Sequence, residues 1–137
     1  MWFVYALLSA LFAAATAVLA KAGIEGVDSH LATAVRTVVV VLVSWGMVFA
    51  TGAQGGIWSV GRKSWLFLVL SGLATGASWL CYYKALHMGD VSKVVPVDKL
   101  STALAIALAF VFLGEHVTAR TLWGCALMLA GTLLIAL

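Results

Sequence analysis

The sequence predicts an all-α, polytopic membrane protein with five transmembrane helices. Three observations support this fold class: 64% of the 137 residues are hydrophobic, only 9% are charged, and the mean hydropathy is +1.13. A soluble domain carries about 25% charged residues, which help to cover the surface that it exposes to water. This chain has too few polar residues for that purpose, so we expect the lipid bilayer to surround it.

Five apolar runs are long enough to cross a membrane, because a helix needs roughly 20 residues to span a hydrocarbon core about 30 Å thick. The first run has no basic segment before it and is longer than the apolar part of a signal peptide, so we interpret it as a span. Short connections join the runs, which predicts one transmembrane domain over residues 1–137. The spans are Trp2–Ala20, Leu31–Ala50, Trp65–Met88, Val91–Leu113 and Thr118–Leu137.

Several function classes are excluded by the pattern of charged and metal-binding residues. The net charge of +3 comes from scattered basic residues, which argues against a nucleic-acid partner. No catalytic constellation or phosphate-binding loop is present, so we expect a protein that is not an enzyme and has no cofactor or bound metal. The histidines lie at span ends without ligand spacing and the cysteines lie inside apolar runs: His30, His87, His116, Cys81 and Cys125.

The fourth run holds the densest group of polar residues inside a span. An ionisable side chain at the bilayer centre costs roughly 2.5–3.5 kcal/mol on insertion scales, so Asp98 and Lys99 require a reason. Pro96 lacks an N–H group and predicts a kink, which often marks a transport site. We expect Asp98 and Lys99 to bind substrate or a proton, with Ser101 and Thr102 beside them.

A structural interpretation of the same residues is also open. Asp98 could pair with a basic residue of a neighbouring helix and only fix the helix register. Lys99 could extend its side chain to the membrane surface. The sequence favours the functional interpretation for Asp98, and it does not separate the two for Lys99.

Other spans supply candidate binding residues of a different kind. Arg36 lies inside the second span, where it could bind a ligand, join an ion pair or anchor a lipid headgroup. Trp79 and Tyr82 share one face of the third span and could line a mildly polar cavity, but the sequence favours plain packing of these rings in the interior or at the membrane interface. Before the fifth span, Glu115 is expected to cap the helix by accepting from its first N–H groups.

The basic residues at the span ends give a weak orientation signal. Arg62, Lys63 and Arg120 flank one membrane face, whereas Lys21 and Lys93 flank the other. A chain with no clear orientation can insert both ways and pair with an inverted copy, so we expect a homodimer that could be antiparallel. A parallel dimer, or assembly with a partner protein, is the alternative.

Three segments of the second half resemble the EamA domain of the drug/metabolite transporter superfamily: Tyr83–Ser101, Leu113–Thr118 and Gly124–Gly131. Together with the five spans, the resemblance covers essentially the whole chain. Most members of that superfamily look like two such units fused in inverted orientation, whereas this sequence has one unit and looks like the single-domain, five-span branch. The resemblance implies secondary active transport of a small metabolite, amino acid or drug-like solute, often as an exporter.

The sequence therefore predicts a homodimeric transporter of the prokaryotic cytoplasmic membrane that works by alternating access. Basic residues outnumber acidic ones inside the spans, which favours an anionic or zwitterionic solute. A second function class is a non-transporting membrane subunit or a component of a lipid flippase. Transport by the purified protein would separate the two classes.

Overall fold

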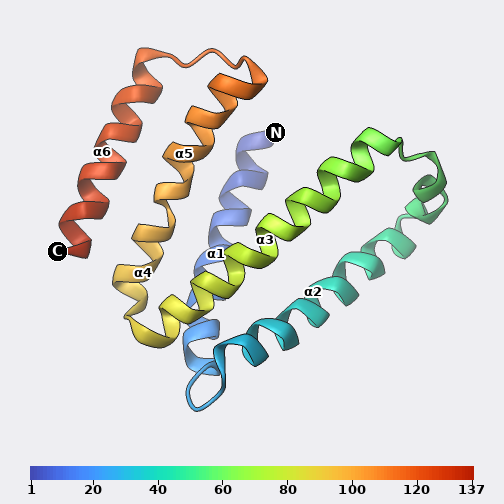
Figure 1. Ribbon diagram of the computed structural model, residues 1–137, viewed down its shortest axis with the longest axis horizontal. Coiled ribbons are helices and arrows are strands. Elements are labelled where there is room, and N and C mark those ends of the chain that lie inside the picture. The colour runs from blue at the N-terminus through green and yellow to red at the C-terminus, as the bar shows by residue number, and fades with distance from the viewer. The chain divides into compact units, whose positions relative to one another are not determined.

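The computed structural model describes residues 1–137 and contains helices and connecting segments but no strand (Figure 1). Five helical stretches are long and apolar enough to cross a membrane. The predicted fold class, all-α with five membrane-spanning helices, is therefore confirmed. The five stretches are Trp2–Gly23, Ser29–Ala50, Arg62–Met88, Val91–Leu113 and Ala119–Ala136.

The chain forms two compact units. The first unit contains Met1–Leu19 and Met88–Leu137, and the second contains Ala20–His87. Helix α1 (Trp2–Gly23) begins in the first unit and ends in the second. Each unit is described by itself below.

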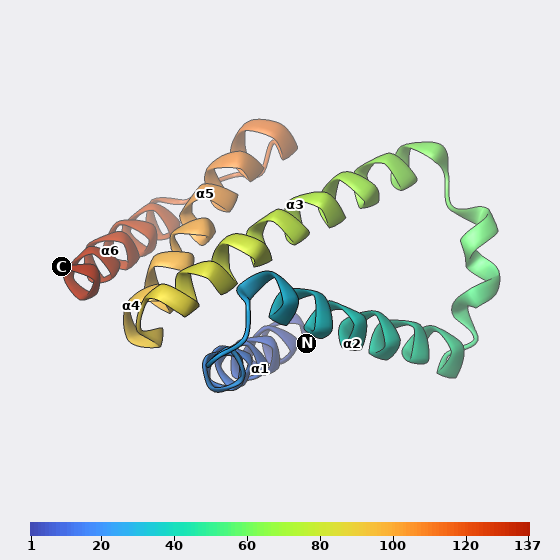
Figure 2. The same ribbon diagram turned by 60° about the horizontal axis from the view of Figure 1, so that its bottom comes forward.

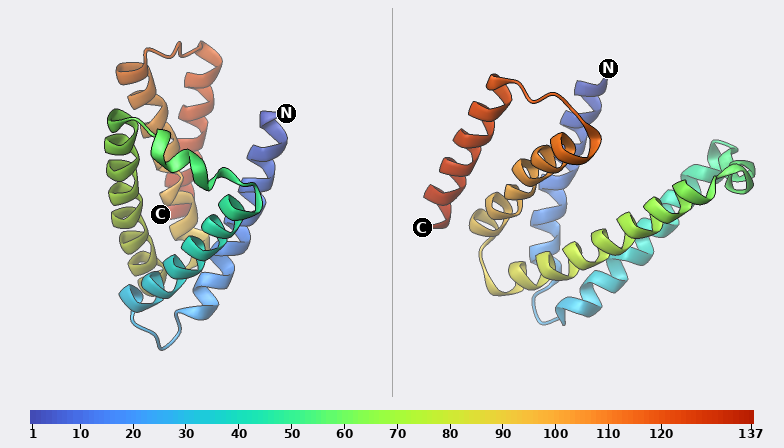
Figure 3. Two further views of the ribbon diagram at one scale, coloured as in Figure 1. Left: turned by 90° about the vertical axis from the view of Figure 1, so that its right-hand side faces the viewer. Right: turned by 45° about the horizontal axis from the view of Figure 1, so that its top comes forward.

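In the first unit, the fourth span consists of three consecutive segments: α4 (Val91–Asp98), α5 (Leu100–Leu108) and the π-helical turn η2 (Ala109–Leu113). Gly114 then adopts a φ of 67°, in the left-handed region that favours glycine, and the chain reverses direction. The returning helix α6 (Ala119–Ala136) packs against α4 and α5, as Figures 1 and 3 show.

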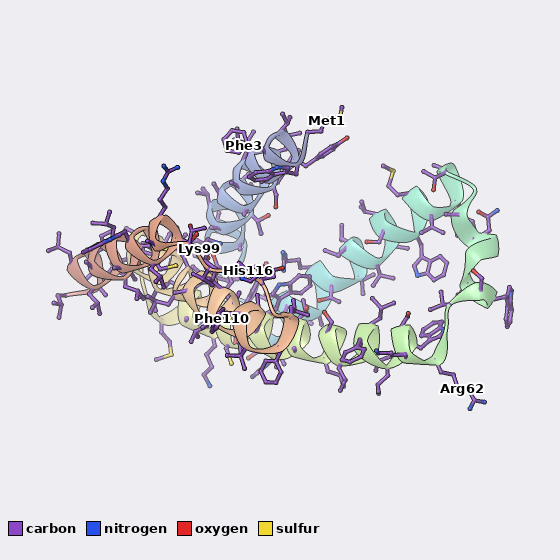
Figure 4. All side chains as sticks on the ribbon, turned by 90° about the horizontal axis from the view of Figure 1, so that it is seen from above. Met1, Phe3, Arg62, Lys99, Phe110 and His116 are labelled. Carbon is purple, nitrogen blue, oxygen red and sulfur yellow. The ribbon has the colours of Figure 1, made fainter.

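The second unit is a hairpin of two long helices, α2 (Ser29–Ala50) and α3 (Arg62–Met88), joined through the short 3₁₀ helix η1 (Ala53–Ser59). The two helices run antiparallel and separate toward η1 (Figures 1 and 2). Figure 4 shows Arg62 at the start of α3 with its side chain pointing away from the unit.

Two contacts fix the other end of the second unit, where α2 begins and α3 ends. The Asp28 carboxylate caps α2 by accepting from the backbone N–H groups of His30 and Leu31 at 2.9 and 3.1 Å. Lys21 donates from Nζ to the carbonyl oxygen of Leu86 at 2.6 Å and so joins the end of α1 to the last turn of α3.

Most large apolar side chains along the long helices are exposed on the isolated chain. In a bilayer, lipid chains and other helices cover such apolar surface. Only the residues at contacts between the helices of one chain therefore need to be buried within it. The buried residues are few: Ala17, Ala20, Ile24, Thr33, Tyr83, Leu86 and Thr132.

Candidate functional site

The fourth span is interrupted at Lys99, between the last residue of α4 and the first residue of α5. The backbone N–H of Lys99 lies 3.2 Å from the carbonyl oxygen of Val95 and 3.1 Å from that of Pro96. The Lys99 N–H is therefore shared between the i−4 and i−3 carbonyls, so the helix tightens locally toward a 3₁₀ turn while it keeps the α-helical bond. Pro96 lies inside α4, three residues before the interruption, and cannot donate to the preceding turn.

Asp98 and Lys99 form an ion pair, with 3.7 Å between Lys99 Nζ and Asp98 Oδ2. The Lys99 side chain is 52% exposed and the Asp98 side chain 37% exposed on the isolated chain. Because the two residues are adjacent in sequence, their pairing does not connect one helix to another. Within a single chain, this pair does not set the register between helices.

A side chain of α6 forms a hydrogen bond to the fourth span beside the interruption. The hydroxyl of Thr132, which is only 5% exposed, donates to the carbonyl oxygen of Pro96 at 3.4 Å. On the other side, the Thr102 N–H donates to the Lys99 carbonyl at 3.0 Å, which begins α5. Thr102 is half-buried, whereas Ser101 is exposed. The first unit therefore brings Pro96, Asp98 and Lys99 together with Thr102.

A second cluster lies in the second unit, where α2 faces α3. The guanidinium carbon Cζ of Arg36 lies 4.2 Å from the centroid of the Trp79 ring and 5.6 Å from that of Tyr83. Both distances are within the range of a cation–π interaction. Tyr82 lies beside this cluster, with its ring centroid 6.2 Å from that of Tyr83.

The threonines near Arg36 satisfy their hydroxyl groups within their own helix. Thr33 donates to the carbonyl oxygen of Ser29 at 2.8 Å, and Thr37 donates to that of Thr33 at 2.7 Å. Thr75 on α3 donates in the same way to Ser71 at 2.9 Å. These hydroxyl protons are used locally, so the guanidinium of Arg36 is the strong hydrogen-bond donor of this cluster.

Two residues outside the spans act as helix caps. Thr118 is the N-cap of α6, and its hydroxyl accepts from the Thr121 N–H at 3.3 Å. Glu115, which we expected at this cap, lies three residues earlier, and its own N–H donates to Ala109 at the end of the fourth span. At the start of α2, the backbone N–H groups of Leu31 and His30 hold the pKa of the Asp28 carboxyl below its ordinary value.

Two contributors were not identified from the sequence. Tyr83 follows Trp79 by four residues, so the i, i+4 spacing places both on one helix face and could have indicated the pair. Thr132 lies among apolar residues in the last span, and no local pattern connects it with Pro96. The contact exists only because α6 folds back onto α4.

Comparison with known proteins identifies the family. The model of the EamA-like transporter family matches residues 1–137, the whole chain. The chain belongs to this family. It is a multi-pass membrane transporter, as the five membrane-spanning helices and the family both indicate.

Two relatives are informative. A Sinorhizobium sp. protein named "uncharacterized transporter in cobO 3' region" is 47% identical over 135 residues, which cover 98% of this chain and 96% of that protein. An uncharacterized protein of Methanocaldococcus jannaschii is 29% identical over 76 residues, which cover 56% of each chain. No solved structure matches the chain significantly.

Proposed function

We propose that this EamA-family chain is a secondary active transporter of the prokaryotic cytoplasmic membrane that exports a small metabolite, an amino acid or a drug-like solute. Membership of a transporter family and the transporter name of the Sinorhizobium relative support this proposal. The observation that carries it is the interruption of the fourth span at Lys99, directly after Asp98. Broken helices place backbone and charged groups where a solute can reach them.

The ion pair at the interruption suits a site that binds either a proton or the solute. In the structure Lys99 Nζ lies 3.7 Å from the Asp98 carboxylate and neutralises it. The ammonium group of a solute such as an amino acid can take the place of Lys99 beside the Asp98 carboxylate, and a proton on Asp98 removes the charge that this ammonium group needs. Proton and solute therefore compete for Asp98, and this competition couples the exit of the solute to the entry of protons.

The exposed fractions of these two side chains favour a homodimer. At 52% and 37% exposure, Lys99 and Asp98 would face lipid if a single chain were alone in the membrane. Lipid penalises exposed charge, whereas a second copy could cover this face and enclose a polar pathway. We therefore propose that two five-helix chains build one alternating-access pathway, with the second copy in either orientation.

The experiment compares three chains at equal membrane abundance in a bacterial host: the wild type, Asp98→Asn and Asp90→Asn. Asp90 is the matched control because it is the N-cap position of the same helix and makes no side-chain capping bond. Untargeted mass spectrometry of the medium should show a compound that the wild type and Asp90→Asn release and that Asp98→Asn does not. Identical media from all three would contradict the proposal.

The compound found in this way is then tested with purified protein in proteoliposomes. A proton gradient should drive its movement through the wild type and not through Asp98→Asn. A non-transporting subunit would move no solute in this assay. A lipid-flippase component would instead transfer a fluorescent phospholipid between leaflets, and that transfer would overturn the proposal.

A further inference from the structure

The guanidinium of Arg36 is a second charged group within the spans. Arg36 is the eighth residue of α2, so at 1.5 Å per residue it lies roughly 10 Å along the helix. The structure gives it no ion pair and no side-chain hydrogen bond, and its partners are the ring faces of Trp79 and Tyr83. A permanent positive charge at this depth is held by aromatic rings alone.

We propose that Arg36, positioned by Trp79 and Tyr83, binds the carboxylate group of the transported solute. This inference rests on the proposed transport function and adds a substrate class to it: small monocarboxylates and amino acids with an apolar body. It concerns the second unit only and uses residues of α2 and α3.

The geometry leaves the donors of Arg36 available to a carboxylate. A guanidinium carries five N–H groups in one plane, in a fork that matches the two oxygens of a carboxylate. Trp79 and Tyr83 contact the cation through their ring faces and accept no conventional hydrogen bond from it. No buried side-chain nitrogen or oxygen of the structure lacks a partner, so the N–H groups of Arg36 must be accessible.

The aromatic residues orient the guanidinium. Tyr83 is 3% exposed and therefore forms a fixed wall, whereas Trp79 is half-buried. Held against these rings, Arg36 loses less conformational freedom when it binds, which favours affinity. The ring faces of Trp79 and Tyr83 form an apolar wall beside the guanidinium, and the Thr33 and Thr37 hydroxyls donate within their own helix. This wall suits a solute that carries an apolar group next to its carboxylate.

The phosphate of a lipid headgroup offers the same anionic oxygen chemistry, so the experiment must separate the two sources. The protein is purified in a maltoside detergent, which carries no phosphate group. Binding is measured by isothermal titration calorimetry. The probes are sodium benzoate, sodium hexanoate and phenylalanine, with benzamide as the uncharged counterpart of benzoate. A second series adds phosphatidylglycerol to the micelles as a competitor.

We expect at least one carboxylate probe to bind the wild type and benzamide not to bind. Arg36→Gln should weaken that binding at least about tenfold, the lower range for loss of hydrogen bonds to a charged group. Arg36→Lys should recover part of the affinity, since lysine keeps the charge but lacks the planar fork. Arg62→Gln is the matched control and should bind as the wild type does, because Arg62 points outward at the start of α3 (Figure 4).

A pair of changes at Trp79 tests its positioning role. Trp79→Phe keeps a ring face and should retain most of the affinity, whereas Trp79→Leu should lose it. Gel filtration and circular dichroism identify any variant that has not folded, and Arg36→Lys and Trp79→Phe are the conservative changes that keep the test valid. Equal binding to the wild type and folded Arg36→Gln would overturn the proposal, as would the failure of every carboxylate probe to bind.

Two results distinguish a failure of the carboxylate site from a failure of the proposed transport function. Binding that requires Arg36 in a protein that moves no solute would uphold the carboxylate site and contradict transport. Transport that is abolished by Asp98→Asn but unchanged by Arg36→Gln would uphold transport and contradict the site. Binding of phosphatidylglycerol that requires Arg36, with no carboxylate probe bound in lipid-free micelles, would assign Arg36 to lipid and overturn the inference.

Discussion

The hydroxyl of Thr132 on α6 donates to the backbone carbonyl oxygen of Pro96 on α4, with 3.4 Å between the two oxygens. This contact joins the last span to the turn in which the fourth span changes its hydrogen bonding. The same carbonyl accepts from the Lys99 N–H at 3.1 Å. α6 therefore supports the interruption directly.

Replacing Thr132 with valine should lower the free energy of unfolding by about 0.6 kcal/mol, the average contribution of interhelical hydrogen bonds in membrane proteins. The effect is small because the Pro96 carbonyl keeps the Lys99 N–H as a donor. SDS-induced unfolding in mixed micelles measures it, with Thr132→Ser as the control that retains the hydroxyl. If Thr132→Ser proves less stable than Thr132→Val, the hydrogen bond is not what the residue contributes.

Replacing Pro96 with alanine restores an N–H group to α4. We expect the variant to unfold no more easily than the wild type, since the added N–H can donate to the carbonyl of Ser92. Its transport rate should nevertheless fall several-fold, because the proposed pathway needs the interruption. Stability and transport are measured on the same preparation. A variant that transports at the wild-type rate would show that the proline is dispensable for the mechanism.

The five-helix assignment followed from the sequence because long apolar runs have few physical alternatives in lipid. Helix ends were harder to place. The first helix continues past Ala20 to Gly23, and the third begins at Arg62 instead of Trp65. Hydropathy detects only the apolar part of a helix, whereas backbone hydrogen bonding continues into polar flanking residues such as Lys21.

The groups of residues around Pro96 and around Arg36 could be predicted only in part from the sequence. The residues around Pro96 are close in the chain, so their proximity could be foreseen. The tyrosine that contacts Arg36 could not be foreseen, because both Tyr82 and Tyr83 follow Trp79 within one turn. Which of the two faces the guanidinium depends on where α2 lies. The structure places Tyr83 under the guanidinium and Tyr82 beside it.

The cap at Asp28 predicts a specific pH dependence. The N–H groups of Leu31 and His30 lower the pKa of this carboxyl in the folded protein, so folding favours the charged form. The stabilisation is therefore present above the unfolded pKa, about 3.9, and is lost as the pH falls through the lower folded value. Melting temperatures between pH 3 and pH 7 should show Asp28→Ala less stable than the wild type, with the difference shrinking at the acidic end.

Asp28→Asn is the control for this titration, since asparagine caps a helix nearly as well as aspartate but does not ionise in this range. Its melting temperature should stay close to that of the wild type near neutral pH. A difference between wild type and Asp28→Ala that stays constant from pH 3 to pH 7 would contradict a role for the carboxylate.

The weak orientation signal of the basic residues allows the chain to insert in both orientations, as an antiparallel homodimer requires. Each terminus should then be labelled from both sides of the membrane. Single cysteines placed at Met1 and at Leu137, in a background without Cys81 and Cys125, report this through membrane-impermeant maleimides. Labelling of each terminus from one side only would restrict the homodimer to the parallel arrangement.

Transport by the proposed mechanism requires that the interrupted fourth span border a water-accessible pathway in the assembled protein. Cysteine accessibility in proteoliposomes tests it most directly, because a thiol reacts with a charged maleimide only where water reaches it. Thr102→Cys, half-buried beside the interruption, is compared with Leu104→Cys, which is 65% exposed on the isolated chain and should face lipid. We expect labelling of Thr102→Cys and none of Leu104→Cys, and an unlabelled Thr102→Cys in folded protein would contradict a water-accessible pathway beside Lys99.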